Sequence, residues 1–342
     1  MAEPASKRTR VESAAAKAAG APWVEKYRPS SLDELVAHKE IISVLKRLIH
    51  ANKLPHLLLY GPPGTGKTST IVAAAKDMYG KAYKSMTLEL NASDDRGIDV
   101  VRNEVKEFAS SKRLFSTGVK LIILDEADMM TNDAQAALRR VIEKYTTNCR
   151  FCLVCNYVNK IIPALQSRCT KFRFAPLAPD QVRGRVQMIA QDEKLVMADK
   201  ALEALLELGC GDMRRILNIL QATSVAYPDE ITYDSLFVVT GNPLPSDIDA
   251  IYAALLNETF KDARRRCEVL CATRGYALAD VVHLVGAKVL DTRFPAHLKA
   301  AILDKLSDVE YRSSFATDER LQLSSFVAAF VAARQHTVSA RS

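Results

Sequence analysis

The sequence predicts an α/β domain with a five-stranded parallel sheet, followed by two helical domains. Short apolar runs alternate with helical patterns up to residue 176, as expected for a parallel sheet with helices on both faces. A glycine-rich loop follows the first of these runs. After Pro176-Leu177-Ala178-Pro179 the strand patterns stop, and Gly241 to Pro245 form a second linker. We expect a disordered tail at 1–20 and three domains at 21–176, 177–240 and 241–342.

Two elements precede the glycine-rich loop. Pro22 and Pro29 bracket an aromatic segment, Pro22-Trp23-Val24-Glu25-Lys26-Tyr27-Arg28-Pro29, which we name the strap. Because the residue before a proline avoids the helical region, the strap is expected to be extended or irregular. Lys39 to Ala51 is expected to form an amphipathic helix, with Ile42, Leu45 and Ile49 toward the core.

The loop itself has the pattern of a phosphate-binding site. His56 to Leu59 is a predicted buried strand, and a helix opens after Thr68, so Gly61-x4-Gly66-Lys67-Thr68 lies in the required context. Glycines let backbone N–H groups turn toward phosphate oxygens, and the helix N-terminus adds partial positive charge. Lys67 would reach the β- and γ-phosphates, and Thr68 would bind Mg²⁺. The expected nucleotide-binding residues are Gly61, Pro62, Pro63, Gly64, Thr65, Gly66, Lys67, Thr68 and Ser69.

The next two strands bring acidic residues to the same sheet. Met86 to Leu90 is a predicted strand that ends at Asn91, and a helix then runs to about Ser110. Lys120 to Leu124 is the third strand and runs directly into Asp125-Glu126-Ala127-Asp128. Four apolar residues followed by Asp-Glu at a strand end form the second half of an ATPase site. Asp125 would complete the Mg²⁺ shell, and Glu126 would polarise the attacking water as general base. For Asp128 the pattern indicates only helix capping.

The last two strands complete the sheet. A helix is predicted at 132–145, a fourth strand at Phe151 to Cys155 that ends at Asn156, and a fifth at Thr170 to Phe174. Asn156 either orients the water or is an ordinary polar residue at a strand end. Gly61, Asn91, Asp125 and Asn156 all follow strands, where parallel sheets bind their ligands.

The helical remainder contains one suggestive cation. Helices are predicted at 180–191, 199–208 and 212–227, and about five more from Ser246 onward without a catalytic signature. Arg214 would lie in the first turn of its helix, where a cation opposes the helix dipole. This unfavourable placement suggests an anion nearby. For Arg215 beside it, a position on the protein surface is a sufficient explanation.

Composition limits the class of protein only broadly. The net charge of +7 (47 basic minus 40 acidic residues) permits a nucleic-acid partner without requiring one. No apolar run approaches a membrane span and no signal peptide is apparent, so we expect the cytosol or nucleus. Lys7-Arg8-Thr9-Arg10 is either part of a nuclear signal or a solvated tail. Cys149, Cys152 and Cys155 have a metal-like spacing, but residues three apart on a strand point to opposite faces. Buried core cysteines are therefore the better interpretation.

Several motifs together carry a resemblance that covers residues 22–340. The chain resembles the small subunits of replication factor C, the eukaryotic sliding-clamp loader of the AAA+ ATPase class. Pro163 to Gln166, Ile248 and Gln322 to Ser325 are most similar to one subtype of these subunits. The motifs are the strap, the Gly61–Thr68 loop, Leu90-Asn91-Ala92-Ser93-Asp94, Asp125-Glu126-Ala127-Asp128, Ser167-Arg168-Cys169 and Gly211-Asp212-Met213-Arg214-Arg215.

The resemblance implies roles at matching positions. Val24 and Arg28 would contact the adenine end of ATP, and Val36 would line that pocket. Asn156 would sense the γ-phosphate together with Arg214 from the second domain, which would be a lid. Arg168 would be an arginine finger that acts in trans on ATP bound to the neighbouring subunit. The third domain would be a collar that holds five subunits in a ring.

The resemblance also implies partners. They are the other replication factor C subunits, the sliding clamp PCNA and the backbone of primer–template DNA, in nuclear DNA replication and repair. Arg96, Arg102 and Lys106 are the candidate DNA contacts, although for Arg102 and Lys106 a solvated helix face is an equal alternative.

Two rival functions stay open at this point. One is a ring member whose ATP site is only a scaffold, and the intact Lys67, Asp125, Glu126 and Arg168 argue against it. The other is a branch-migration helicase with the same ATPase core. The helical pattern after Pro245 favours a collar over the winged helix that such a motor would need.

Overall fold

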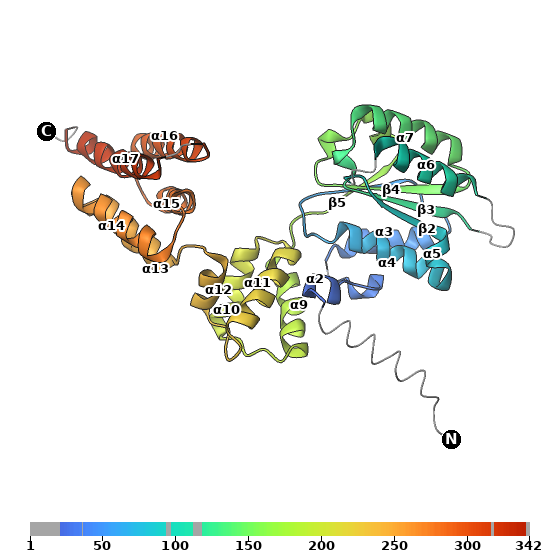
Figure 1. Ribbon diagram of the computed structural model, residues 1–342, viewed down its shortest axis with the longest axis horizontal. Coiled ribbons are helices and arrows are strands. Elements are labelled where there is room, and N and C mark those ends of the chain that lie inside the picture. The colour runs from blue at the N-terminus through green and yellow to red at the C-terminus, as the bar shows by residue number, and fades with distance from the viewer. Residues whose placement is uncertain (1–20, 36, 94–96, 112–117, 316–317, 340–342) are drawn as a thin grey trace, which may run out of the picture. The chain divides into compact units, whose positions relative to one another are not determined.

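The protein is described from a computed structural model (Figure 1). The structure describes residues 21–35, 37–93, 97–111, 118–315 and 318–339. Backbone contacts group the chain into two compact units, divided between Ser224 and Val225. The expected division into three domains is finer than this grouping and stays a prediction.

The strap contains one turn of helix, so the expectation of extended or irregular chain was wrong for these residues. Helix α2 (Trp23–Lys26) begins after Pro22, whose φ of −54° suits entry into a helix. It ends before Arg28, the residue that Pro29 keeps out of the helical region. The restriction imposed by a proline reaches only one residue back, which leaves Trp23 to Lys26 free to turn.

A short helix, η1 (Leu32–Glu34), leads from the strap to α3 (Lys39–His50). Ile42 and Leu45 of α3 are buried, as the amphipathic pattern predicted.

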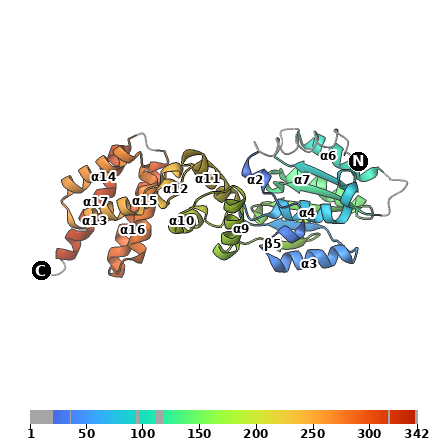
Figure 2. The same ribbon diagram turned by 90° about the horizontal axis from the view of Figure 1, so that it is seen from below.

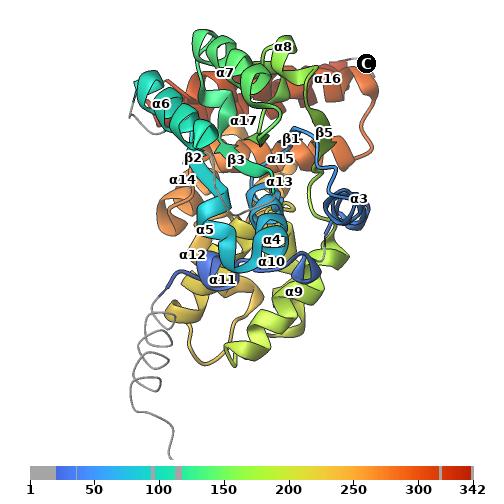
Figure 3. The same cartoon turned by 90° about the vertical axis from the view of Figure 1, so that its right-hand side faces the viewer.

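The sheet has five parallel strands in the order β2-β3-β4-β1-β5, so the predicted fold class is confirmed. Figure 3 labels β1, β2, β3 and β5 of this sheet. The register pairs Tyr60 with Cys155 and Asn91 with Asp125. The loop after β1 and the ends of β2, β3 and β4 therefore meet at one edge, where parallel sheets bind ligands. The strands are β1 (Leu57–Tyr60), β2 (Thr87–Asn91), β3 (Lys120–Asp125), β4 (Cys149–Cys155) and β5 (Thr170–Arg173).

Helices cover both faces of the sheet (Figure 1). Alternate strand residues point to opposite faces: Leu57 and Leu59 pack in one apolar cluster with α3 and α4 (Lys67–Tyr79). Leu58 packs in a second cluster with α6 (Gly97–Ser110) and α7 (Asn132–Tyr145). The other helices of this part of the chain are η2 (Gly80–Ala82), α5 (Tyr83–Met86), η3 (Ala127–Met129), η4 (Val158–Lys160) and α8 (Pro163–Gln166).

The spaced cysteines of β4 belong to this core. Cys152 packs in the cluster of α3 and α4, whereas Cys149 and Cys155 pack in the cluster of α6 and α7. All three are buried, so the prediction of core cysteines is confirmed. Burial raises the pKa of the Cys155 thiol to about 12, which keeps it protonated and unreactive near neutral pH.

Three helices, which we name the lid helices, follow the sheet. They are α9 (Pro179–Asp192), α10 (Asp199–Gly209) and α11 (Met213–Ala226), close to the bounds expected from the sequence. Arg214 lies in the first turn of α11, as predicted.

The regular elements that the structure describes in the second unit are helices (Figure 2). Its apolar cluster includes Phe326 and Phe330, which are 0% and 1% exposed, so the apolar face of the last helix is buried within its own unit. No helix in the described ranges is long and apolar enough to cross a membrane. The helices are α12 (Tyr233–Thr240), α13 (Pro245–Asn257), α14 (Phe260–Arg274), α15 (Leu278–Asp291), α16 (Ala296–Ser313) and α17 (Glu319–Ser339).

His56, at the start of β1, predicts a pH dependence of stability. It is 8% exposed, and its Nδ1 accepts a hydrogen bond of 3.1 Å from the backbone N–H of Phe151. Burial, with a smaller contribution from Arg150, lowers the pKa of His56 from 6.5 to about 4. The unfolded chain therefore binds more protons between those values. The contribution of His56 to the free energy of unfolding should be complete above pH 6.5. It should fall by about 3 kcal/mol as the pH drops to about 4.

Thermal unfolding between pH 4 and 7.5 checks this, with His56→Asn as the comparison because Asn keeps an acceptor but does not titrate in this range. The wild-type melting temperature should fall more steeply below pH 6.5 than that of the variant. Parallel curves would show that His56 does not carry the effect.

Candidate nucleotide site

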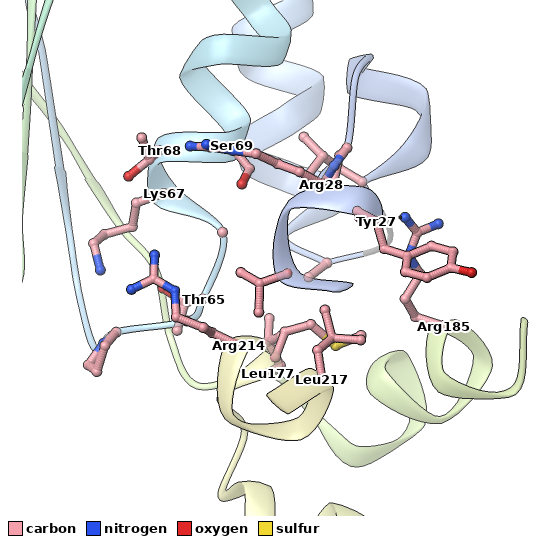
Figure 4. Close-up of a pocket in the computed structure, with 18 of the residues that line it drawn as sticks. Tyr27, Arg28, Thr65, Lys67, Thr68, Ser69, Leu177, Arg185, Arg214 and Leu217 are labelled. Carbon is pink, nitrogen blue, oxygen red and sulfur yellow. Dashed lines mark hydrogen bonds between the residues drawn. The ribbon is translucent and has the colours of Figure 1, made fainter. Parts of the chain in front are cut away.

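A cavity in the first unit lies between the glycine-rich loop, the strap and the lid helices (Figure 4). Its lining comes from segments far apart in the sequence, which only the fold brings together. In Figure 4, Lys67 and Thr65 lie at one end, and Tyr27 and Arg185 lie at the other. The expected binding residues that line it are Val24, Arg28, Pro63, Gly64, Thr65, Gly66, Lys67, Thr68, Ser69, Asp125, Asn156 and Arg214.

Two glycines of the loop are required by close contacts. A Cβ on Gly61 would lie 2.0 Å from the carbonyl oxygen of Phe174. A Cβ on Gly64 would lie 1.6 Å from Oδ1 of Asp212, and Gly64 has a φ of +66°, which side chains rarely adopt. Gly64 also accepts a hydrogen bond of 3.2 Å from the backbone N–H of Met213. The loop therefore packs directly against the first turn of α11.

Lys67 places a buried cation at the end of the cavity that the glycine-rich loop forms, which we name the phosphate end. It is 7% exposed, and its Nζ donates to Gly61 O at 2.9 Å and to Pro62 O at 2.8 Å. It also donates to Oδ1 of Asn156 at 2.9 Å. Burial lowers the pKa of Lys67, while the charge of Asp125 opposes this shift. The ammonium group lies beside the N-terminus of α4, where backbone N–H groups favour an anion.

The oxygen atoms near this cation suit a hard metal ion. The hydroxyl of Thr68 donates to Oδ2 of Asp125 at 2.8 Å. A hydroxyl and a carboxylate in contact at the end of a parallel strand match the oxygen ligands that Mg²⁺ prefers. These residues fit the predicted metal role.

Glu126 is exposed and has a φ of 52°, in the left-handed region. Its backbone N–H donates to Oδ1 of Asp125 at 2.9 Å. A left-handed glutamate costs about 1 kcal/mol, and such strain is concentrated at functional sites. The conformation supports the prediction that Glu126 has a chemical role.

Asp128 has a structural role that its sequence pattern did not indicate, because that pattern indicated only helix capping. It is 8% exposed, and its Oδ2 accepts hydrogen bonds from the backbone N–H groups of Asn156 at 3.2 Å and Tyr157 at 3.1 Å. Asp128 thereby connects the end of β3 to the end of β4 and holds Asn156 beside Lys67. The nearest signal in the sequence was its place in Asp125-Glu126-Ala127-Asp128.

Arg214 faces the same end of the cavity as Lys67 (Figure 4). Asp212 fixes the start of α11, because its Oδ1 accepts from the N–H groups of Arg214 at 2.8 Å and Arg215 at 3.1 Å. Two cations and the N-terminus of α4 therefore converge where phosphates were predicted.

Some predicted residues are not among those that line the cavity, namely Gly61, Pro62, Lys106 and Arg168, and others are not fully described. Val36 and Arg96 fall outside the described residues, and of Arg102 only the backbone position in α6 is described. Lys106 is partly exposed on α6.

Arg168 is not among the residues that line the cavity. It is partly exposed after α8, and its guanidinium bonds Oε1 of Glu143 at 2.5 Å and the carbonyl of Ala164 at 2.7 Å. An arginine outside its own site is compatible with action on a neighbouring subunit.

Gly64→Ala should weaken nucleotide binding about tenfold, because Asp212 must move from α11 and the phosphate loop must shift. Gly80→Ala is the matched control: φ is +49° there, but no heavy atom of the described residues lies within 4 Å of the added Cβ. Equilibrium binding of Mg-ATP to both full-length variants measures the difference. Equal affinities would contradict the contact between the loop and α11.

Comparisons with known proteins agree with this geometry. Residues 57–177 match the model of the ATPase family associated with various cellular activities (AAA), and residues 243–329 match the replication factor C C-terminal domain. Replication factor C subunit 5 of Homo sapiens is 50% identical over 327 residues, which cover 95% of this chain and 96% of that protein. Replication factor C subunit 3 of Saccharomyces cerevisiae is 48% identical over 316 residues, with 91% and 93% covered.

Among solved structures, a RuvB protein of Thermotoga maritima superposes with a TM-score of 0.51 at 17% identity, covering 79% of this chain and 99% of that one. At this identity the likeness shows the fold alone. The sequence motifs at Pro163 to Gln166, Ile248 and Gln322 to Ser325 predicted the subunit called 5 in animals and 3 in budding yeast. The relatives found carry these names, so they agree with that prediction.

Proposed function

The chain belongs to the replication factor C family of AAA+ ATPases, and we propose that it is the ATPase subunit of a heteropentameric loader for the sliding clamp PCNA. In this proposal, ATP binding closes the ring of subunits, which then grips and opens the clamp. Primer–template DNA completes the sites, hydrolysis loosens the grip, and the closed clamp stays on DNA. The observation that carries the proposal is the nucleotide site, where Lys67 donates a hydrogen bond to Asn156 at 2.9 Å and Thr68 donates one to Asp125 at 2.8 Å.

The residues of this site have distinct tasks in the proposal. Lys67 and the N–H groups of the loop hold the phosphates of ATP, and Glu126 takes a proton from the attacking water. Asn156, at the end of a sheet strand, and Arg214, on a lid helix, sense the γ-phosphate. Mg²⁺ supplies charge neutralisation at the β- and γ-phosphates, and Thr68 and Asp125 would hold it. Val24 and Arg28 contact the base.

The finger and the DNA contacts involve other molecules. Arg168 stabilises the developing charge on ATP bound to the neighbouring subunit. Arg96, Arg102 and Lys106 follow the phosphate backbone of DNA, which gives recognition of shape without base reading. Residues 177–240 act as the lid domain and 241–342 as the collar that joins the subunits. These roles place the protein in the nucleus, in DNA replication and repair.

The direct test is clamp loading by a complex reconstituted from this chain and its sister subunits. PCNA retained on primed circular DNA should depend on ATP and on the presence of this chain. If the complex that lacks this chain retains as much PCNA, the proposal is wrong.

A second measurement separates a clamp loader from a branch-migration motor, the rival with the same ATPase core. Native mass of the assembly should correspond to five different subunits with one copy of this chain. A homohexamer would favour the motor.

A further inference from the structure

The strap has little packing of its own to hold it in place. Helix α2 has no buried residue, and no side chain caps its N-terminus. A single turn of helix is unstable in isolation, because its one or two hydrogen bonds do not offset the entropy lost in ordering it. The position of the strap must therefore come from contacts with the rest of the protein.

Those contacts lead to the lid helices. The backbone N–H of Trp23 donates to Oε1 of Gln221 on α11 at 3.0 Å. The guanidinium of Arg185, on α9, donates to the carbonyl oxygen of Tyr27 at 3.0 Å. In Figure 4, Tyr27 and Arg185 lie side by side at the end of the cavity away from Lys67.

The strongest of these contacts converge on Glu193, the C-cap residue that directly follows α9. Its Oε1 accepts from Nζ of Lys26 at 2.6 Å and from the hydroxyl of Tyr27 at 2.7 Å. The side chain of Glu193 is 19% exposed, so water competes for this carboxylate less than it does at a fully exposed pair. Hydrogen bonds to a charged group are about twice as strong as neutral ones. One carboxylate thus fixes two consecutive residues of the strap.

The same segment forms one end of the cavity. Val24, Tyr27 and Arg28 of the strap line it together with Arg185 and Leu217 of the lid helices. The phosphate end is built differently, mainly from the loop and the strand ends with Lys67 and Asp125, and Arg214 of α11 faces it. The cavity therefore has a sheet-built end and an end built by the strap and the lid helices.

We propose that Glu193 is a positioning residue that fixes the strap to the lid helices and so builds the base-binding end of the nucleotide cavity. This inference rests on the proposed function, in which the cavity binds ATP and Val24 and Arg28 contact the base. Glu193 does not touch the reacting atoms. Its loss leaves the phosphate end in place but frees the strap, and binding must then order the strap again at an entropic cost.

The test uses the full chain and Mg-ATP. Glu193→Ala should weaken binding of Mg-ATP about tenfold, the loss expected for a charged hydrogen-bonded anchor. Glu193→Gln should recover part of the affinity, because its amide oxygen still accepts hydrogen bonds. Glu203→Ala, at an exposed position on α10, is the matched control and should bind as wild type.

A double-variant cycle identifies the route of the effect. If Glu193 acts through the strap, Tyr27→Phe should weaken binding too, and combining it with Glu193→Ala should give less than the product of the two losses. Losses that multiply in full would mean that the two residues act independently.

Hydrogen exchange supplies a readout that general destabilisation does not reproduce. In Glu193→Ala, amide exchange should increase at residues 23–28 and stay unchanged in the loop at 64–68. An equal increase in both segments, or unchanged affinity for Mg-ATP, would overturn the inference. Failure of the wild-type chain to bind Mg-ATP would instead count against the proposed function, since the exchange result depends only on the anchor.

Discussion

Arg168→Ala should remove about 10³-fold or more of the DNA-stimulated hydrolysis at the neighbouring subunit's site, while this chain's own affinity for ATP stays unchanged. The guanidinium lies outside its own cavity and is partly exposed, held by Glu143 and the carbonyl of Ala164. An arginine that stabilises transition-state charge in trans changes the rate of hydrolysis at the neighbouring subunit's site. It does not change the binding of ATP to its own chain.

ATP hydrolysis by the reconstituted complex, with and without clamp and primed DNA, measures this effect. Because only one of several sites loses its finger, the complex should lose the share of the stimulated rate that this site contributes. Lys171→Ala is the control, since Lys171 is an exposed cation on neighbouring β5. An unchanged total rate would show that the assignment of Arg168 to a subunit interface is wrong.

Glu126→Gln should lower hydrolysis at this chain's own site by about 10²–10⁴-fold and leave ATP binding intact. The amide cannot take a proton from the attacking water, whereas the binding contacts of Lys67 and Thr68 do not involve the Glu126 side chain. Gln has nearly the same size as Glu, so we expect the backbone of residue 126, with its φ of 52°, to be kept and only the chemistry of the side chain to change.

Single-turnover hydrolysis in the complex, alongside ATP binding, separates the two quantities. Asp133→Asn removes an exposed carboxylate in the first turn of the next helix, α7, and should hydrolyse ATP as wild type. A Glu126→Gln complex with a normal rate at every site would favour the rival in which this ATP site is only a scaffold.

The sheet and the phosphate end of the cavity were accessible from sequence because their signals are local. Strand, loop and helix follow one another along the chain at Gly61 to Thr68, and Asp125 directly follows the run of Lys120 to Leu124. Parallel pairing then brings separate strand ends to one edge, a consequence of topology that needs no knowledge of side-chain contacts.

The strap and its anchors were not accessible in the same way. Pro29 restricts only Arg28, the residue before it, so Trp23 to Lys26 can form the turn of α2. The two prolines had led us to expect that the whole segment is extended or irregular. The contacts of Glu193 with Lys26 and Tyr27 span 167 and 166 residues, and nothing in the neighbourhood of Glu193 indicates them. Asp128 is an intermediate case, since its motif was visible but its hydrogen bonds to the end of β4 were not.

The most direct test of the central claim, that this chain uses its own ATP site to load the clamp, is PCNA loading by a complex that carries Lys67→Ala. Lys67 is the buried cation that joins the phosphate loop to Asn156, so its loss should remove ATP-dependent loading while the complex still assembles. We expect PCNA on primed circular DNA to fall to the level seen without ATP. Loading equal to that of the wild-type complex would contradict the account and leave this chain as a structural member of the ring.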